Sequence, residues 1–123
     1  MKNNILQTVP AIFNETVDKN RNRTAMRTKH LGLWQDISWG RYHEQVRCIG
    51  SALVSLGLAK GDAACIIGDN CVEWVTADLG IQCMGGVSVG IYATNAWTQV
   101  EYVVTHSDAK FLFVENEEAL GFF

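Results

Sequence analysis

The side chains of this sequence that could do chemistry include a glycine-containing turn, two carboxylate pairs, three histidines and four cysteines. The turn, "GDN" at 68–70, follows an apolar run and precedes a predicted helix, whose free N–H groups and partial positive charge attract anions. A dinucleotide-binding turn needs Gly-x-Gly-x-x-Gly, whereas this turn has one glycine followed by Asp69, whose charge repels phosphate. The pattern therefore predicts helix capping by Asn70 and Glu73 rather than phosphate binding.

The carboxylate pairs have the residue type that general acid–base catalysis uses. Asp69 precedes Glu73 at the start of a predicted helix, and Glu117 and Glu118 are adjacent near the end of the chain. Each pair is better explained as favouring the positive end of a helix or as facing solvent. The pairs therefore give no support to acid–base chemistry.

The histidines and a second glycine cluster also complete no catalytic motif. His30, His43 and His106 are far apart in sequence, no Ser or Cys nucleophile motif stands beside them, and no Gly-x-Ser-x-Gly elbow occurs. The glycines of "GGVSVG" at 85–90 come at the end of a helix and inside a strand, the reverse of the order in a phosphate loop. We therefore assign no catalytic, cofactor-binding or metal-binding residue in this chain.

The cysteines stand at 48, 65, 71 and 83, without a Cys-x-x-Cys pair and without a histidine at zinc-site spacing. Cys65 lies in an apolar run and Cys83 on a predicted helix. We expect all of them to be small core residues, free thiols in a reducing compartment. The first residues, "MKNNILQTVP", lack the long apolar segment of a signal peptide, and no apolar stretch is long enough to span a membrane. A cytosolic location is the expectation.

The basic side chains gather in one stretch, Lys19 to Lys29, although the net charge is −3. Nucleic-acid binding is disfavoured by that overall balance. The stretch has the charge to face a phosphate or an anionic membrane, but a solvated loop leading into a strand is the preferred interpretation. A hydrophobic content of 48% is that of a globular protein with a packed core.

The first half of the chain predicts a short helix, a hairpin and a longer helix. Residues 8–18 carry apolar side chains at helical spacing, with Pro10 near the start. The runs "TAMRTK" and "LWQDISW", split by "HLG", predict a β-hairpin. Ser38 is the expected N-cap of the longer helix, which Gly57 ends. The apolar stripe of that helix consists of Tyr42, Val46, Ile49, Leu53 and Leu56.

The second half predicts strands alternating with helices. "AACII" at 63–67 has the continuous apolar character of a strand buried on both faces. A helix from Asn70 to the glycines at 85 and 86 carries the apolar side chains of Trp74, Val75, Leu79 and Ile81. "VSVGIY" is the next strand, followed by a helix begun by Thr94 or Asn95 and by the strand "AKFLFVE". This alternation predicts an α/β fold with a mostly parallel sheet and flanking helices.

The run "GDNCVEWVTADLGIQCMGGVSVGIYATN" through "VEYVVTHSDAKFLFVENEE" resembles the N-terminal part of long-chain fatty-acid–CoA ligases of the AMP-forming adenylating superfamily. The resemblance covers about residues 8–118 and departs from the family where many relatives have proline in place of Gly90 or Ala93, and in the tail "ALGFF". The residues that carry it are Gly68, Asn70, Glu73, Trp74, Asp78, Gly85, Gly86, Tyr92, Thr94, Ser107, Ala109 and Lys110.

The resemblance implies that residues 1–123 are an incomplete N-terminal part of an AMP-binding (acyl-CoA synthetase) domain, inactive alone. The last residues, "NEEALGFF", start what resembles another helix, and a chain that ends there looks truncated. The parent enzyme would use ATP, magnesium and coenzyme A to convert a fatty acid to acyl-CoA through an acyl-adenylate. Its Ser/Thr/Gly-rich phosphate loop, adenine segment and catalytic lysine have no match here, so no cofactor is expected to bind this chain.

Three questions stay open at this point. A small non-catalytic α/β binding or interaction domain is the alternative function, and a shorter acid or another carboxylate is the alternative substrate of the parent. The parent is expected in the cytoplasm, with homodimerisation and a peripheral association with a membrane both left open.

Overall fold

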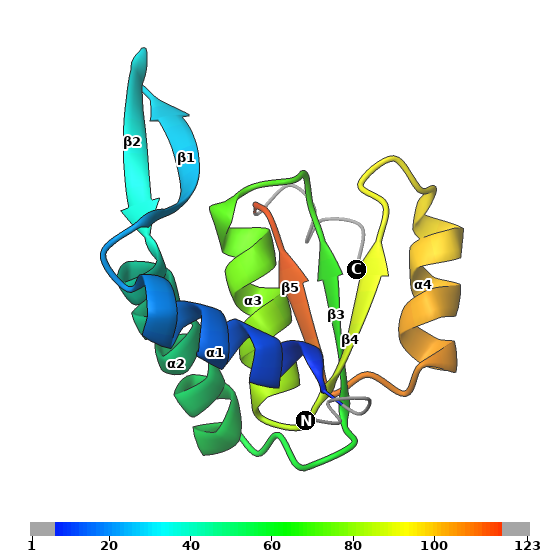
Figure 1. The fold of residues 1–123 in the computed structure, drawn as a ribbon. Helices are drawn as coiled ribbons and strands as arrows, with labels where there is room; N and C mark the ends of the chain where they lie inside the picture. Colours follow the sequence, from blue (N-terminus) through cyan, green and yellow to red (C-terminus); the bar gives the residue numbers. More distant parts are fainter. Residues whose placement is uncertain (1–6, 117–123) are drawn as a thin grey trace.

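The computed structural model describes residues 7–116, and the predicted alternation of helices and strands is present (Figure 1). The predicted helix over "NEEALGFF" and the pair Glu117 and Glu118 lie outside the described residues, apart from Asn116. In chain order the elements are α1 (Val9–Asn20), β1 (Thr24–His30), β2 (Leu33–Ser38), α2 (Trp39–Ser55), β3 (Ala63–Ile67), α3 (Val72–Cys83), β4 (Val87–Ile91), α4 (Trp97–His106) and β5 (Phe111–Val114).

A parallel sheet with the order β4-β3-β5 forms the centre of the fold. Its middle strand alternates between two apolar layers, because successive side chains of a strand point to opposite faces. Ala64 and Ile66 pack in a cluster with residues of α2 and α3, whereas Cys65 packs with Val100 of α4. Figure 1 shows α3 and α4 on opposite sides of the sheet, so the predicted α/β class and the two-sided burial of β3 are confirmed.

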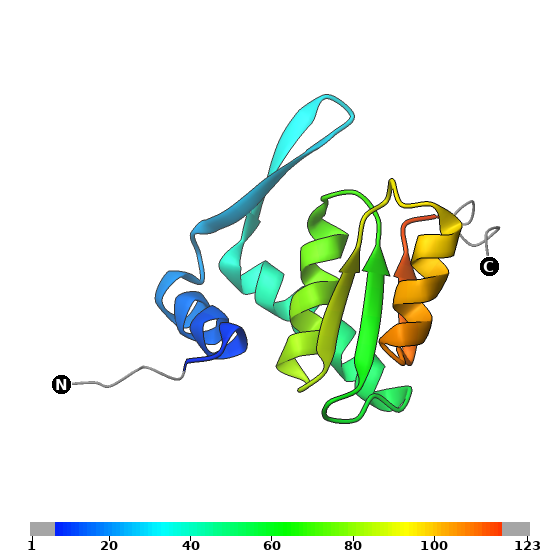
Figure 2. The ribbon, with the colours of Figure 1, turned by 90° about the vertical axis from the view of Figure 1, so that its right-hand side faces the viewer.

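The strands β1 and β2 form an antiparallel hairpin that is separate from the parallel sheet. Leu31 and Gly32, at the turn, both have positive φ values, 50° and 80°. This is the sign pattern of a type I′ turn, whose twist matches that of the flanking strands. Figures 1 and 2 show the hairpin projecting from the rest of the molecule, joined to it by α1 and α2. The predicted hairpin is confirmed.

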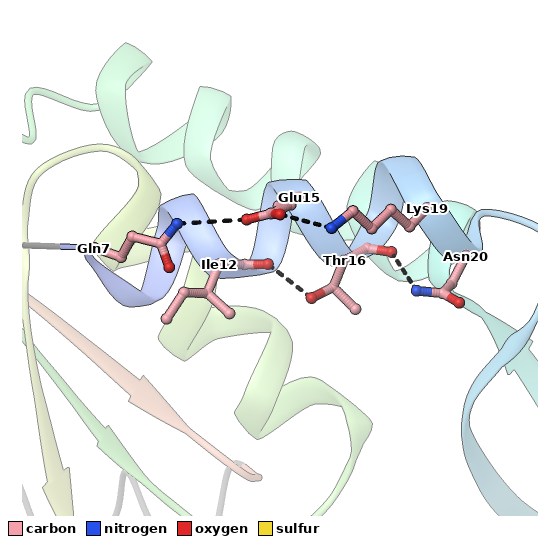
Figure 3. A network of polar contacts seen from close by, with 6 residues as sticks. All are labelled: Gln7, Ile12, Glu15, Thr16, Lys19 and Asn20. Carbon is pink, nitrogen blue, oxygen red and sulfur yellow. Dashed lines mark hydrogen bonds and ion pairs between the residues drawn. The ribbon is translucent and has the colours of Figure 1, made fainter. Parts of the chain in front are cut away.

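The helix α1 is held to the body by Phe13 and Val17, both of which are buried. The Thr8 side chain accepts a hydrogen bond from the Ala11 N–H (3.2 Å) and so caps the helix. Polar contacts also run along the helix (Figure 3). They are Lys19–Glu15 (2.7 Å), Gln7–Glu15 (3.5 Å), Thr16 Oγ1 to the Ile12 carbonyl (2.8 Å) and Asn20 Nδ2 to the Thr16 carbonyl (3.0 Å).

The helix α2 begins as predicted, with the Ser38 hydroxyl accepting from the Arg41 N–H at 3.1 Å. Tyr42, Val46 and Leu53 are buried, but Leu56 is 74% exposed, so its place in the apolar stripe was wrongly predicted. The helix ends at Ser55, one residue before Leu56, and the chain then leaves the helical path on which the stripe is based.

Two predicted helix starts need correction. The N-cap of α3 is Cys71 rather than Asn70, and no side chain caps this end. The N-cap of α4 is Ala96 rather than Thr94 or Asn95, and Gln99 Oε1 accepts the Ala96 N–H at 3.1 Å instead. A side chain of capping type near a helix start does not determine which residue has the extended backbone that the N-cap position requires.

The expectation that all four cysteines are core residues is wrong for two of them. Cys65 is buried and Cys83 is half-buried, whereas Cys48 and Cys71 are exposed. Cys48 lies on α2 two positions after Val46, which is off the buried stripe because helix neighbours on one face are three or four residues apart. Cys71 stands at the exposed start of α3.

Candidate functional site

The carboxyl ends of the parallel strands form the candidate site, since ligands of open α/β sheets bind in the crevice outside these ends. A cavity of about 410 Å³ lies between the ends of β3 and β4. It collects side chains from the β3–α3 turn, α3, β4 and the loop after β4. Its lining is Gly68, Asp69, Asn70, Trp74, Gly90, Ile91, Tyr92, Ala93 and Thr94.

Trp74 of α3 sets one wall of this cavity. A Cβ atom at position 90 would lie 3.2 Å from Trp74 Cζ2. Glycine at 90 therefore lets the indole lie close to β4. Any side chain there would push the indole away from the strand and change the shape of the cavity.

A second cavity of about 410 Å³ lies between the ends of β3 and β5, on the side of α3. Glu115, just after β5, accepts a hydrogen bond from the Asp69 N–H through Oε2 (3.4 Å). Asp69, Glu73 and Glu115 thus all line this cavity. Within residues 7–116 no ion pair is formed by any of these three carboxylates.

Three carboxylates around the start of α3 offset the partial positive charge of the helix, which makes this end less favourable for an anionic group. Among the described residues, no group of three His, Cys, Asp or Glu side chains could hold a metal ion. Asp69, Asn70 and Glu73 all lie at the carboxyl ends of the strands, where they line one or both cavities. The predicted capping of α3 by Asn70 does not occur.

The exposed thiol of Cys71 lies beside the second cavity. Partial burial, with an addition from the neighbouring Glu73, raises the pKa of this thiol above its ordinary value. A raised pKa keeps a thiol protonated and therefore a weak nucleophile at neutral pH. The site contains no activated cysteine at this position.

Tyr42 of α2 lies further inside, where its hydroxyl donates to the Val75 carbonyl at 3.4 Å. Burial, then the charges of Asp78 and Cys83, raise the pKa of Tyr42 to about 12. The phenol is therefore neutral at physiological pH and acts as a packing residue rather than a base. Half-burial likewise raises the pKa of the Cys83 thiol.

A larger groove, of about 540 Å³, runs between α2, α3 and β5. The Oε1 atom of Gln45 is buried and has no hydrogen-bond partner in the part of the chain that the structure describes. Sequence reasoning missed this groove, because its walls come from elements that only the tertiary fold brings together. The lining residues are Arg41, Glu44, Gln45, Cys48, Ile49, Val72, Glu73, Thr76, Ala77 and Phe113.

The three histidines lie on different elements. His30 ends β1, His43 stacks on Phe13 with ring centroids 5.9 Å apart, and His106 stacks on Tyr102 at 5.3 Å. None of them lines the cavities at the strand ends. In the described residues, no helix is long and apolar enough to cross a bilayer.

Comparison of the sequence with known proteins shows which family the chain matches. The family profile of AMP-binding enzymes matches residues 13–121. The long-chain-fatty-acid–CoA ligase ACSBG2 of Mus musculus is 34% identical over 92% of this chain, and the ligase FadD15 of Mycobacterium bovis is 32% identical over 89%. This chain spans only 17% and 20% of these two relatives.

Solved structures of other proteins have a similar fold. The anthranilate CoA ligase AuaEII, solved with anthranoyl-AMP, has a TM-score of 0.87 at 25% identity and is matched over 100% of this chain and 23% of its own. The N-terminal subdomain of NpsA from Klebsiella oxytoca has a TM-score of 0.80 at 22% identity, over 90% of this chain and 28% of its own.

Proposed function

Because this chain belongs to the AMP-binding enzyme family, we propose that it supplies the N-terminal part of a long-chain fatty-acid–CoA ligase. The single observation that carries the proposal is the 34% identity to a curated ligase of this kind over 92% of the chain. The whole enzyme activates a fatty acid with ATP and magnesium to an acyl-adenylate and then forms acyl-CoA. It acts in the cytoplasm and does not bind nucleic acid.

The described residues contribute scaffold to this reaction rather than chemistry. Adenylation builds charge on the α-phosphate and on the leaving pyrophosphate, which requires a backbone cradle and cations. The carboxylates of Asp69, Glu73 and Glu115 at the strand ends do not provide such a cradle. The residues that bind ATP therefore lie in other parts of the enzyme.

The groove between α2, α3 and β5 supports this assignment. Phe113 of β5 is only half-buried beside it, and apolar surface of this kind is normally covered in an assembled domain. Covering by the rest of the ligase would also supply a donor for the Gln45 oxygen. A homodimer of the ligase is a further way to cover such surface.

The test is a chimera in which residues 13–121 replace the matching segment of the mouse ligase. The chimera is expected to release pyrophosphate from ATP in the presence of palmitate, whereas the 123-residue chain alone releases none. A chimera that folds but adenylates only a different class of carboxylic acid would overturn the long-chain assignment. Pyrophosphate release by the chain alone would overturn its role as scaffold.

The second candidate is a non-catalytic α/β binding domain, and the cavity between β3 and β4 favours it because it includes Trp74 and Tyr92. The transcript beyond the codon for Phe123 separates the two candidates. An open frame that continues into a Ser/Thr/Gly-rich loop ending in Pro-Lys-Gly supports the ligase. A stop codon, with the 123-residue product intact in cells, supports the binding domain.

A further inference from the structure

The hairpin tip, defined as residues 31–34, exposes more apolar surface than a solvated turn requires. Leu31 is 88% exposed, Leu33 70% and Trp34 67%. Turns normally carry Gly, Asn, Asp or Ser, each of which suits the backbone or the solvent. Figures 1 and 2 show the tip at the far end of the hairpin, away from the helices and the parallel sheet.

Leu31 is unfavourable for the backbone as well as for solvation. Its φ of 50° lies in the left-handed region, which is strained for a residue with a Cβ. Asn or Gly would fit the first position of a type I′ turn better. Within residues 7–116, packing of the exposed Leu31 side chain does not offset this strain, which indicates a role at a surface.

The apolar side chains surround the tip rather than forming one face. Trp34 pairs with Lys29 across the hairpin, and Leu33 pairs with His30. Neighbouring positions of a strand point to opposite faces, so Trp34 and Leu33 lie on opposite sides, with Leu31 between them at the turn. A protein partner would normally cover one face, whereas insertion into lipid surrounds the tip on all sides.

Lys29 is the cation nearest the tip in the part of the chain that the structure describes, because Arg27, two positions further from the turn, is paired with Asp36 at 2.9 Å. The Lys29 ammonium lies 5.8 Å from the centre of the Trp34 ring, so an aromatic ring and a cation stand side by side. This combination suits the boundary of a bilayer, where Trp sits at headgroup level and Lys reaches anionic lipid.

We propose that the hairpin tip, through Leu31, Leu33 and Trp34, inserts into the headgroup boundary of an anionic phospholipid bilayer while Lys29 binds lipid phosphate. Leu31, Leu33 and Trp34 line neither the strand-end cavities nor the groove, so the proposal extends the proposed function without depending on it. The contact is shallow and reversible, because it involves few apolar side chains.

The test is sedimentation of the protein with vesicles of phosphatidylcholine and phosphatidylserine. Leu31→Asn is the informative variant, because Asn fits the positive φ and so preserves the fold, as circular dichroism checks. Its vesicle affinity should fall about tenfold, the equivalent of one leucine side chain left out of the lipid. Leu56→Asn, the same change at an exposed leucine just after α2, is the matched control and should bind as the unaltered protein does.

Trp34 fluorescence distinguishes insertion from surface attraction. The difference between the emission of the unaltered protein and that of Trp34→Phe should shift to shorter wavelength with the mixed vesicles and less with phosphatidylcholine alone. No binding to either vesicle, or equal loss of binding in Leu31→Asn and Leu56→Asn, would overturn the proposal. Binding without a shift of Trp34 emission would overturn insertion.

Discussion

The parallel sheet and the hairpin are made of strands of similar length, but they are stabilised in different ways. Four of the five residues of β3 are buried, and both faces of this strand are covered by helices. In β1 and β2 only Ile37 is buried, and the visible interactions are local: the Arg27–Asp36 ion pair at 2.9 Å and the contact of Lys29 with Trp34.

This difference means that the sheet residues mainly determine stability, whereas the exposed hairpin residues mainly determine the chemistry of the surface. Side chains of the sheet are constrained by packing, where the loss of a few methyl groups is costly. Side chains beyond the base of the hairpin have little effect on packing, so packing does not restrict which residues stand there. The exposed leucines and the tryptophan at the tip are therefore more informative about function than the residues of β3.

The largest expected effect tests the sheet side of the comparison. Ile81→Ala removes a fully buried side chain from the cluster between α3 and β3, and should lower the free energy of unfolding by about 3 kcal/mol. Urea denaturation followed by circular dichroism measures it. Ile12→Ala, the same change at a half-exposed position of α1, is the control and should cost less than about 1 kcal/mol. Equal losses would show that burial does not distinguish the two positions.

Tyr42 tests the contact between the hairpin and the helices, because it packs in the cluster that also contains Ile37 at the base of the hairpin. Its pKa is raised to about 12, so above pH 10 the unfolded chain loses the phenolic proton before the folded protein does. Stability should fall between pH 10 and pH 12, by at most about 2 to 3 kcal/mol.

Urea midpoints of the unaltered protein and of Tyr42→Phe, measured side by side at each pH, isolate this loss from other titrating groups. The variant should be slightly less stable at neutral pH, because it loses the weak hydrogen bond to Val75. The gap should close or reverse as the pH approaches 12. A gap that stays constant would mean that the Tyr42 phenol titrates normally.

A smaller effect of opposite sign is expected in the hairpin. Leu31→Asn should raise the free energy of unfolding by up to about 1 kcal/mol, because Asn tolerates the positive φ at this turn. Thermal unfolding measures it. Leu33→Asn, beside the turn but in a strand, is the control and should not stabilise the protein. A destabilised Leu31→Asn would show that the leucine supports the fold after all.

The smallest effect concerns the exposed ion pair of the hairpin. Arg27→Gln breaks the contact with Asp36 and should cost about 0.5 kcal/mol or less, because both side chains are solvated. The cost should vanish in high salt. A loss comparable with that of Ile81→Ala would contradict the view that the hairpin contributes little to stability.

The order and type of the elements could be predicted from the sequence, since periodicity, glycines and Ser38 are local signals. Helix starts were less accurate: Asn70 precedes the true N-cap of α3, because the backbone of a turn depends on tertiary packing. The exposure of Leu56 and Cys71 had the same cause, as each lies just outside a helix.

The candidate site was only partly predictable. Asp69 could be identified as unfavourable to phosphate, but its contact with Glu115 joins segments far apart in the sequence. The groove beside β5 and the orphaned oxygen of Gln45 depend on three elements meeting in space. No local sequence pattern predicts that these three elements will be in contact. The separation of the hairpin from the parallel sheet also had no sequence signal.

The pairing of β3 with β5 has a consequence for how the chain folds. All of α3, β4 and α4 lies between the two strands, so a long loop must close before Ala64 meets Phe111. The β1–β2 pairing closes over two residues and can form in about 1–10 μs. The hairpin should therefore appear early in refolding, and docking of β5 should limit the rate at which the sheet is completed.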